Sequence, residues 1–137
     1  MTPDEASFLQ DFEACTLPAE AWTHRAHIHM GWLQLQRAPY PDALARIRAG
    51  IRRFNTEVLA RRQQYHDTVT IAFTRLIAAA LRAGESFDAF CDRNPELLAK
   101  NPGILQYHYS ADLLATDAAR TGFVEPDLAP LPPAPEP

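Results

Sequence analysis

The sequence predicts an all-α protein: a bundle of about four main helices, followed by short C-terminal helices and an extended proline-rich tail. Three observations lead to this fold class. Long proline-free stretches carry apolar residues at helical spacing, and no useful length of chain alternates apolar and polar residues as a strand does. Half of the 12 prolines fall in the last dozen residues. We therefore expect one helical domain over residues 1–124 and a tail over residues 125–137.

The first two main helices are expected on either side of a short turn. Residues 4–15 form the first, because Phe8 and Phe12 lie on one helical stripe. The second begins near residues 19–22 and runs to about Arg37, since the residue before Pro39 is pushed out of the α region.

The remaining helices have recognisable starts or stops. The third is expected to begin at Pro41, whose fixed φ suits a first helical turn, and the fourth to span residues 66–83 with Gly84 as its left-handed stop. The third carries a core-facing stripe at intervals of three and four residues: Leu44, Ile47, Ile51 and Phe54. Four short helices should follow, capped by Ser86, Asn94, Ser110 and Thr116.

Composition and charge exclude several classes of partner. The formal net charge of −4 and the pI of about 5.7 give no field that would attract nucleic acid or an anionic membrane. The longest apolar stretch, residues 77–81, is far shorter than the roughly 20 residues of a membrane-spanning helix. With two cysteines and no signal-peptide pattern at its N-terminus, the protein is expected in the cytoplasm with reduced thiols.

The candidate catalytic and metal-binding side chains are most concentrated in residues 22–29, which hold three of the five histidines. On a helix, His24 and His27 are three residues apart and share a face, whereas His29 points elsewhere. Such a pair can bind one metal ion, or can place one imidazole as a base beside another that orients substrate.

A second polar segment, residues 65–68, lies at the start of an otherwise apolar helix. Packing does not require Tyr65, His66 and Thr68 there, so they are candidate site residues; the alternative is that Thr68 or Asp67 merely caps the helix and His66 is exposed. Glu13 follows the edge of the first helix's apolar stripe and can supply a carboxylate, or it can face solvent.

Four segments carry a resemblance to a known group: residues 12–18, residues 22–28, residues 65–68, and residues 119–120 together with 123–128. The chain resembles small bacterial all-helical proteins of unassigned function, whose marks are an aromatic-x-His-x-x-His segment and a Tyr-His-acid-Thr segment. The resemblance implies the site residues Glu13, His24, His27, Tyr65, His66 and Thr68. It leaves out His29 and His108, and residues 56–64 depart from the Gly-rich loop typical of the group.

Three functions are compatible with these residues. The first is a mononuclear Zn²⁺ or Fe²⁺ enzyme acting on a small polar molecule, by hydrolytic, lyase or oxygenase chemistry. Its metal ligands would be His24, His27 and His66, with Glu13 as fourth ligand or as partner of a ligand. Its catalytic residues would be Glu13, Tyr65 and Thr68.

The second function is a metal-free enzyme in which His24 or His66 is a general base tuned by Glu13 or Asp67. The third is a non-catalytic helical module that binds a small ligand or a protein. The partner that we expect is a small-molecule ligand or substrate, and neither nucleic acid nor membrane; the chain can form a homodimer.

Overall fold

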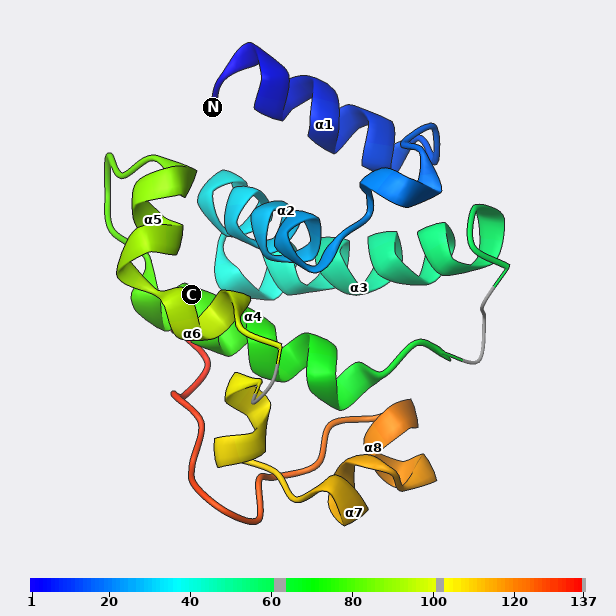
Figure 1. Ribbon diagram of the computed structural model, residues 1–137, viewed down its shortest axis with the longest axis vertical. Helices are drawn as coiled ribbons and strands as arrows, with labels where there is room; N and C mark the ends of the chain where they lie inside the picture. The colour runs from blue at the N-terminus through cyan, green and yellow to red at the C-terminus, as the bar shows by residue number, and fades with distance from the viewer. Residues whose placement is uncertain (61–63, 101–102, 137) are drawn as a thin grey trace. The chain divides into compact units, whose positions relative to one another are not determined.

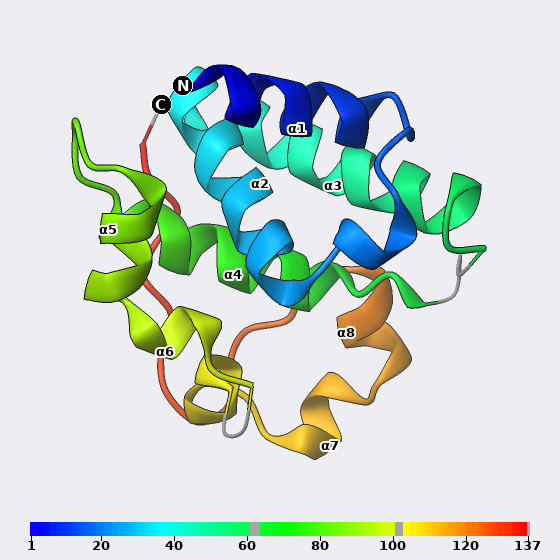
Figure 2. The ribbon, with the colours of Figure 1, turned by 45° about the horizontal axis from the view of Figure 1, so that its top comes forward.

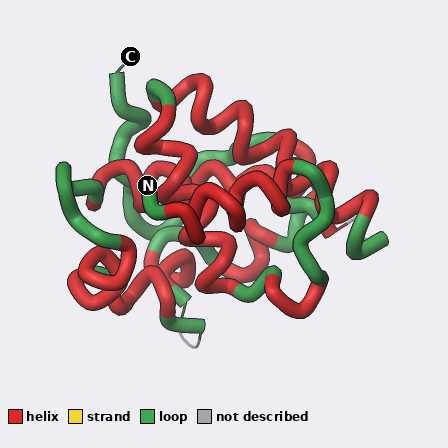
Figure 3. Tube along the Cα trace, turned by 90° about the horizontal axis from the view of Figure 1, so that it is seen from above, coloured by secondary structure: helices red, strands yellow, loops and turns green. Residues whose placement is uncertain are grey.

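The computed structural model describes residues 1–60, 64–100 and 103–136, and it confirms the all-α fold class. Over these ranges the chain forms eight α-helices, and a single isolated bridge joins Lys100 to Gly103. Figure 3 shows helices joined by loops, with no strand in the described part of the chain. The helices fall into two compact units, residues 1–65 and 66–137. No helix of the described residues combines the length and the apolar character needed to cross a membrane.

The first unit contains three α-helices and one short 3₁₀ helix. These are α1 (Pro3–Glu13), the 3₁₀ helix (Ala19–Ala21), α2 (His24–Arg37) and α3 (Tyr40–Glu57). α2 packs against α3, and α1 packs against both, as Figures 1 and 2 show from two directions. The expected second helix from residue 19 is wrong in its start, because Thr23 adopts an extended conformation and caps a new helix there.

Local capping fixes both ends of α1. Thr2 and Glu5 form a reciprocal capping box, in which each side chain accepts a hydrogen bond from the other's backbone N–H. At the other end Cys15 takes a φ of 60°, a left-handed conformation that cannot continue the helix. α1 therefore ends at Glu13, two residues before the end predicted from the sequence.

The core of the first unit is built around the ring of Phe12. It lies 4.6 Å from the ring of Trp22 and 5.6 Å from that of Phe54, measured between centroids. A glycine on α3 makes room for this ring, because a Cβ at Gly50 would lie only 2.7 Å from Phe12 Cε2. Packing around Phe12 thus joins α1 to α3 and to Trp22, which lies just before α2.

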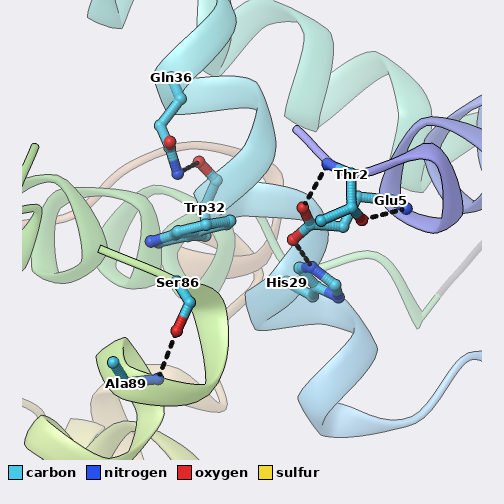
Figure 4. A network of polar contacts seen from close by, with 7 residues as sticks. All are labelled: Thr2, Glu5, His29, Trp32, Gln36, Ser86 and Ala89. Atoms are coloured by element: carbon cyan, nitrogen blue, oxygen red, sulfur yellow. Dashed lines mark hydrogen bonds and ion pairs between the residues drawn. The ribbon is translucent and has the colours of Figure 1, made fainter. Parts of the chain in front are cut away.

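The second unit consists of one long helix and several short ones. They are α4 (Asp67–Ala80), α5 (Phe87–Arg93), α6 (Pro95–Leu98), a 3₁₀ helix (Ile104–Tyr107), α7 (Ala111–Leu114) and α8 (Asp117–Thr121). The predicted caps Ser86, Ser110 and Thr116 are confirmed, since each side chain accepts a backbone N–H three residues later; Figure 4 shows the bond at Ser86.

Two expectations about helix ends in this unit are wrong. The Asn94 side chain does not cap α6 and instead donates from Nδ2 to the carbonyl of Phe90, 2.9 Å away. Gly84 does have the expected positive φ of 76°, but α4 has already ended at Ala80. Leu81 leaves the helix in an extended conformation, so Gly84 serves the following turn.

The first half of the proline-rich tail runs along the second unit as a strap. The backbone N–H of Leu128 donates to the carbonyl of His108 at 2.9 Å, and Nδ1 of His108 donates to the carbonyl of Ala129 at 3.0 Å. Asp127 accepts hydrogen bonds from both the backbone N–H and the hydroxyl of Ser110. Residue Leu131 packs against the small core cluster of this unit.

Candidate functional site

His27 is held in one orientation by the cap of its own helix. The carbonyl of Thr23 lies 3.0 Å from the backbone N of His27 and 2.7 Å from its Nδ1. A carbonyl oxygen only accepts hydrogen bonds, so Nδ1 carries the proton of the neutral ring. The other nitrogen, Nε2, therefore presents a lone pair.

The indole of Trp22 forms one wall beside this imidazole. The two ring centroids are 3.8 Å apart, and the residues occupy the positions just before the cap and four after it, where a hydrophobic staple forms. His27 is partly buried, and this burial lowers the pKa of its imidazole, with the nearby His24 adding to the effect and the Thr23 hydrogen bond opposing it. His27 is thus neutral at pH 7.

His24 begins α2, so the two histidines have the three-residue helical spacing that the sequence predicts. His29 has other partners in the same unit. Its Nε2 lies 2.7 Å from Glu5 Oε2, as Figure 4 shows. Its ring stacks on Phe8. Burial raises the pKa of Glu5, but bonds from the Thr2 backbone and from His29 outweigh it and lower that pKa.

Glu13 lies at the last position of α1 and forms an ion pair. Its Oε1 is 3.3 Å from Nη1 of Arg37, and its backbone carbonyl accepts a hydrogen bond from Nη1 of Arg53 at 3.1 Å. The carboxylate is partly exposed. To act as a metal ligand or as a base, the Glu13 carboxylate would therefore have to give up its ion pair with Arg37.

Tyr65, at the end of the first unit, is buried and lies beneath a cation. The guanidinium carbon of Arg52 is 4.6 Å from the centroid of its ring. This cation–π contact joins Tyr65 to α3.

In the second unit, both ring nitrogens of His66 are engaged in hydrogen bonds. Nδ1 accepts from the backbone N–H of Val69 at 3.2 Å, which makes His66 itself the N-cap of α4. Nε2 lies 2.8 Å from the carbonyl of Leu114 and must donate to it. His66 thus has the tautomer opposite to that of His27, with no nitrogen left for a metal ion or a proton.

Thr68 is fully buried, and its hydroxyl holds the start of the tail. It donates to the carbonyl of Gly122 at 2.8 Å and accepts from the backbone N–H of Val124 at 3.1 Å. The hydroxyl of Tyr109 donates to the carbonyl of Val124 at 2.7 Å, next to this pair of bonds.

The predicted site residues therefore divide between the two units. Glu13, His24, His27 and Tyr65 belong to residues 1–65, and His66 and Thr68 to residues 66–137. Within either unit, the described residues contain no group of three or more His, Cys, Asp or Glu side chains that could hold a metal ion.

The sequence reasoning missed one polar residue of α2, Gln34. Its side chain is completely buried, and neither amide atom has a hydrogen-bond partner within the described part of the chain. Gln34 follows His27 by seven positions, about two helical turns, so the two side chains lie on one face of the helix. That spacing within an otherwise apolar stretch was the signal available in the sequence.

The neutral state of His27 makes stability depend on pH below the ordinary histidine pKa of 6.5. The unfolded chain takes up the proton at 6.5, whereas the folded chain takes it up only at lower pH, so the free energy of unfolding falls as the pH falls through this window. Urea unfolding of wild type and of His27→Gln tests this: the variant should lose part of the dependence, and His24→Gln should keep most of it. Equal pH dependence in wild type and His27→Gln would contradict the assignment.

Comparison with known families, curated proteins and solved structures finds no match to this chain.

Proposed function

We propose that the first unit carries a metal-free catalytic site in which Nε2 of His27 is a general base acting on a small polar molecule. The observation that supports this most is the 2.7 Å bond from Nδ1 to the Thr23 carbonyl, because it leaves the lone pair on Nε2. A base fixed in this way needs no change of tautomer before it takes a proton.

The surroundings of His27 suit that role. When Nε2 takes a proton the ring becomes positive, and the Thr23 carbonyl stabilises the charged ring through the same Nδ1–H bond. Trp22 keeps one face of the ring from water. The lowered pKa of His27 keeps the base unprotonated at neutral pH and lets it release the proton after each turnover.

One further residue on the same helix face can orient a substrate. His24 lies one turn before His27. Gln34 shares this face, but it is completely buried, so its amide is out of reach of a substrate. A molecule with polar groups suits the two histidines better than an apolar one.

The test uses 5-nitrobenzisoxazole, a probe of base strength. A general base removes the proton from its C3 carbon while the ring N–O bond breaks, and the product is a coloured cyanophenolate. We expect the protein to exceed an equal concentration of free imidazole by about tenfold or more, within the range of positioned bases, with EDTA present. His27→Gln should reduce the rate to that of free imidazole.

His108→Gln is the matched control, because Nδ1 of His108 also donates to a backbone carbonyl, that of Ala129, but the residue lies in the second unit. Its rate should equal that of wild type. An unchanged rate in His27→Gln, or a rate abolished by EDTA, would overturn the proposal.

A second candidate function, the Zn²⁺ or Fe²⁺ site, is favoured by one feature. Metal-binding histidines typically donate their second ring nitrogen to a carbonyl or carboxylate, as His27 does to Thr23. His24 and His27 would supply two ligands. Mass spectrometry of the purified protein before and after His24→Ala checks this function: stoichiometric metal that falls in the variant supports it, and substoichiometric, unchanged metal removes it.

A further inference from the structure

The tail and α4 enclose a groove in the second unit. Its volume is about 260 Å³. It is lined by Arg75 of α4 and by residues 125–131 of the tail, which leaves α8 and follows the second unit in Figure 1. The hydrogen bonds of Asp127, Leu128 and Ala129 described above fix the outer wall of this groove.

Arg75 brings a cation to the groove. Its guanidinium carbon lies 4.5 Å above the centroid of the Phe123 ring, which holds the group flat. Nε of Arg75 is buried, so a molecule in the groove would meet the Nη end of the guanidinium. A ligand carboxylate is an acceptor that matches the planar geometry of those N–H groups.

The tail brings two carboxylates to the same groove, Glu125 and Asp127. Hydrogen bonds from the hydroxyl and backbone N–H of Ser110 lower the pKa of Asp127 and keep it ionised. The charge of Glu125 also acts on Tyr109, outside the lining of the groove. Burial is the main cause that raises the pKa of Tyr109 to about 12, and the charge of Glu125 is the second. The groove thus holds one positive and two negative groups.

We propose that this groove binds a small zwitterion, such as a free α-amino acid, with its carboxylate on Arg75 and its ammonium group facing Glu125 and Asp127. A dianion would be repelled by the two carboxylates, and a simple amine would leave Arg75 without a partner. The prolines and leucines that line the rest of the groove suit a short aliphatic side chain.

The experiment titrates the ¹⁵N-labelled full chain with three molecules of nearly equal size at constant ionic strength, followed by amide NMR shifts. L-alanine carries both charges, propionate only the carboxylate, and ethylamine only the ammonium group. We expect saturable shifts at residues 125–131 with L-alanine, and affinities lower by about two- to fivefold for the other two, the ratio that one exposed ion pair supplies. Equal affinities for all three, or no saturable shift with L-alanine, would overturn the proposal.

Variants assign the binding to these side chains. Glu125→Gln, a change at an exposed residue, and Arg75→Met should each weaken L-alanine binding by about two- to fivefold. Arg82→Met removes an exposed arginine beyond the end of α4, outside the groove, and should bind as wild type does. Wild-type binding by Glu125→Gln would contradict the proposed ammonium site even if Arg75→Met fails to fold.

Discussion

Replacing Phe12 by alanine is expected to lower the free energy of unfolding of the first unit by about 3–5 kcal/mol, the usual cost of deleting a buried phenylalanine. Phe12 is 1% exposed, and its ring contacts the rings of Trp22 and Phe54. The space would not close easily, because Gly50 has no side chain with which to fill it. The cost should therefore lie in the upper part of that range.

Phe8→Ala is the matched control for this substitution, since it removes the same side chain from the same helix. Phe8 is only partly buried and stacks on His29, so we expect a loss of about 1 kcal/mol. Both tryptophans of the chain lie in the first unit, so their fluorescence during urea unfolding reports on that unit alone. Equal losses for the two variants would contradict the central place of Phe12 in this core.

Replacing Thr68 by valine is expected to destabilise the second unit by about 2–4 kcal/mol, because two partly buried backbone groups lose their partner. The shape of the side chain is nearly kept, but the carbonyl of Gly122 and the N–H of Val124 no longer have the hydroxyl that they share. Amide exchange at Val124 should accelerate, and urea unfolding followed by circular dichroism should shift to lower denaturant.

Thr70→Val controls for the substitution itself. Its hydroxyl, two residues further along α4, only donates to the carbonyl of His66, which already accepts the backbone N–H of Thr70. We expect a change within about 0.5 kcal/mol. If Thr68→Val cost no more than Thr70→Val, the hydroxyl of Thr68 would not be what holds the tail.

Local patterns predicted much of the secondary structure. The serine and threonine caps at positions 86, 110 and 116 act over three residues, and the paired spacing of His24 and His27 follows from one helix. The start of α2 was placed too early, since Thr23 is preceded by residues that could equally have been helical. Capping by His66 is unusual, and nothing in its sequence neighbours favoured it over Thr68.

The hydrogen bonds and ion pairs of the candidate site residues could not be predicted from the sequence, because they join distant parts of the chain. Glu13 meets Arg37 across 24 residues, His66 meets Leu114 across 48, and Thr68 meets Gly122 across 54. Such contacts depend on tertiary packing, which residue spacing does not encode. His27 differs, since the carbonyl that fixes its tautomer is only four residues away.

The most direct test of a base at His27 is ¹⁵N NMR of the imidazole rings at neutral pH, which distinguishes protonated from unprotonated ring nitrogens. We predict that Nδ1 of His27 is protonated and Nε2 is not, whereas His66 shows the reverse pattern in the same spectrum. A His27 ring protonated on Nε2, or carrying both protons, would contradict the proposed role.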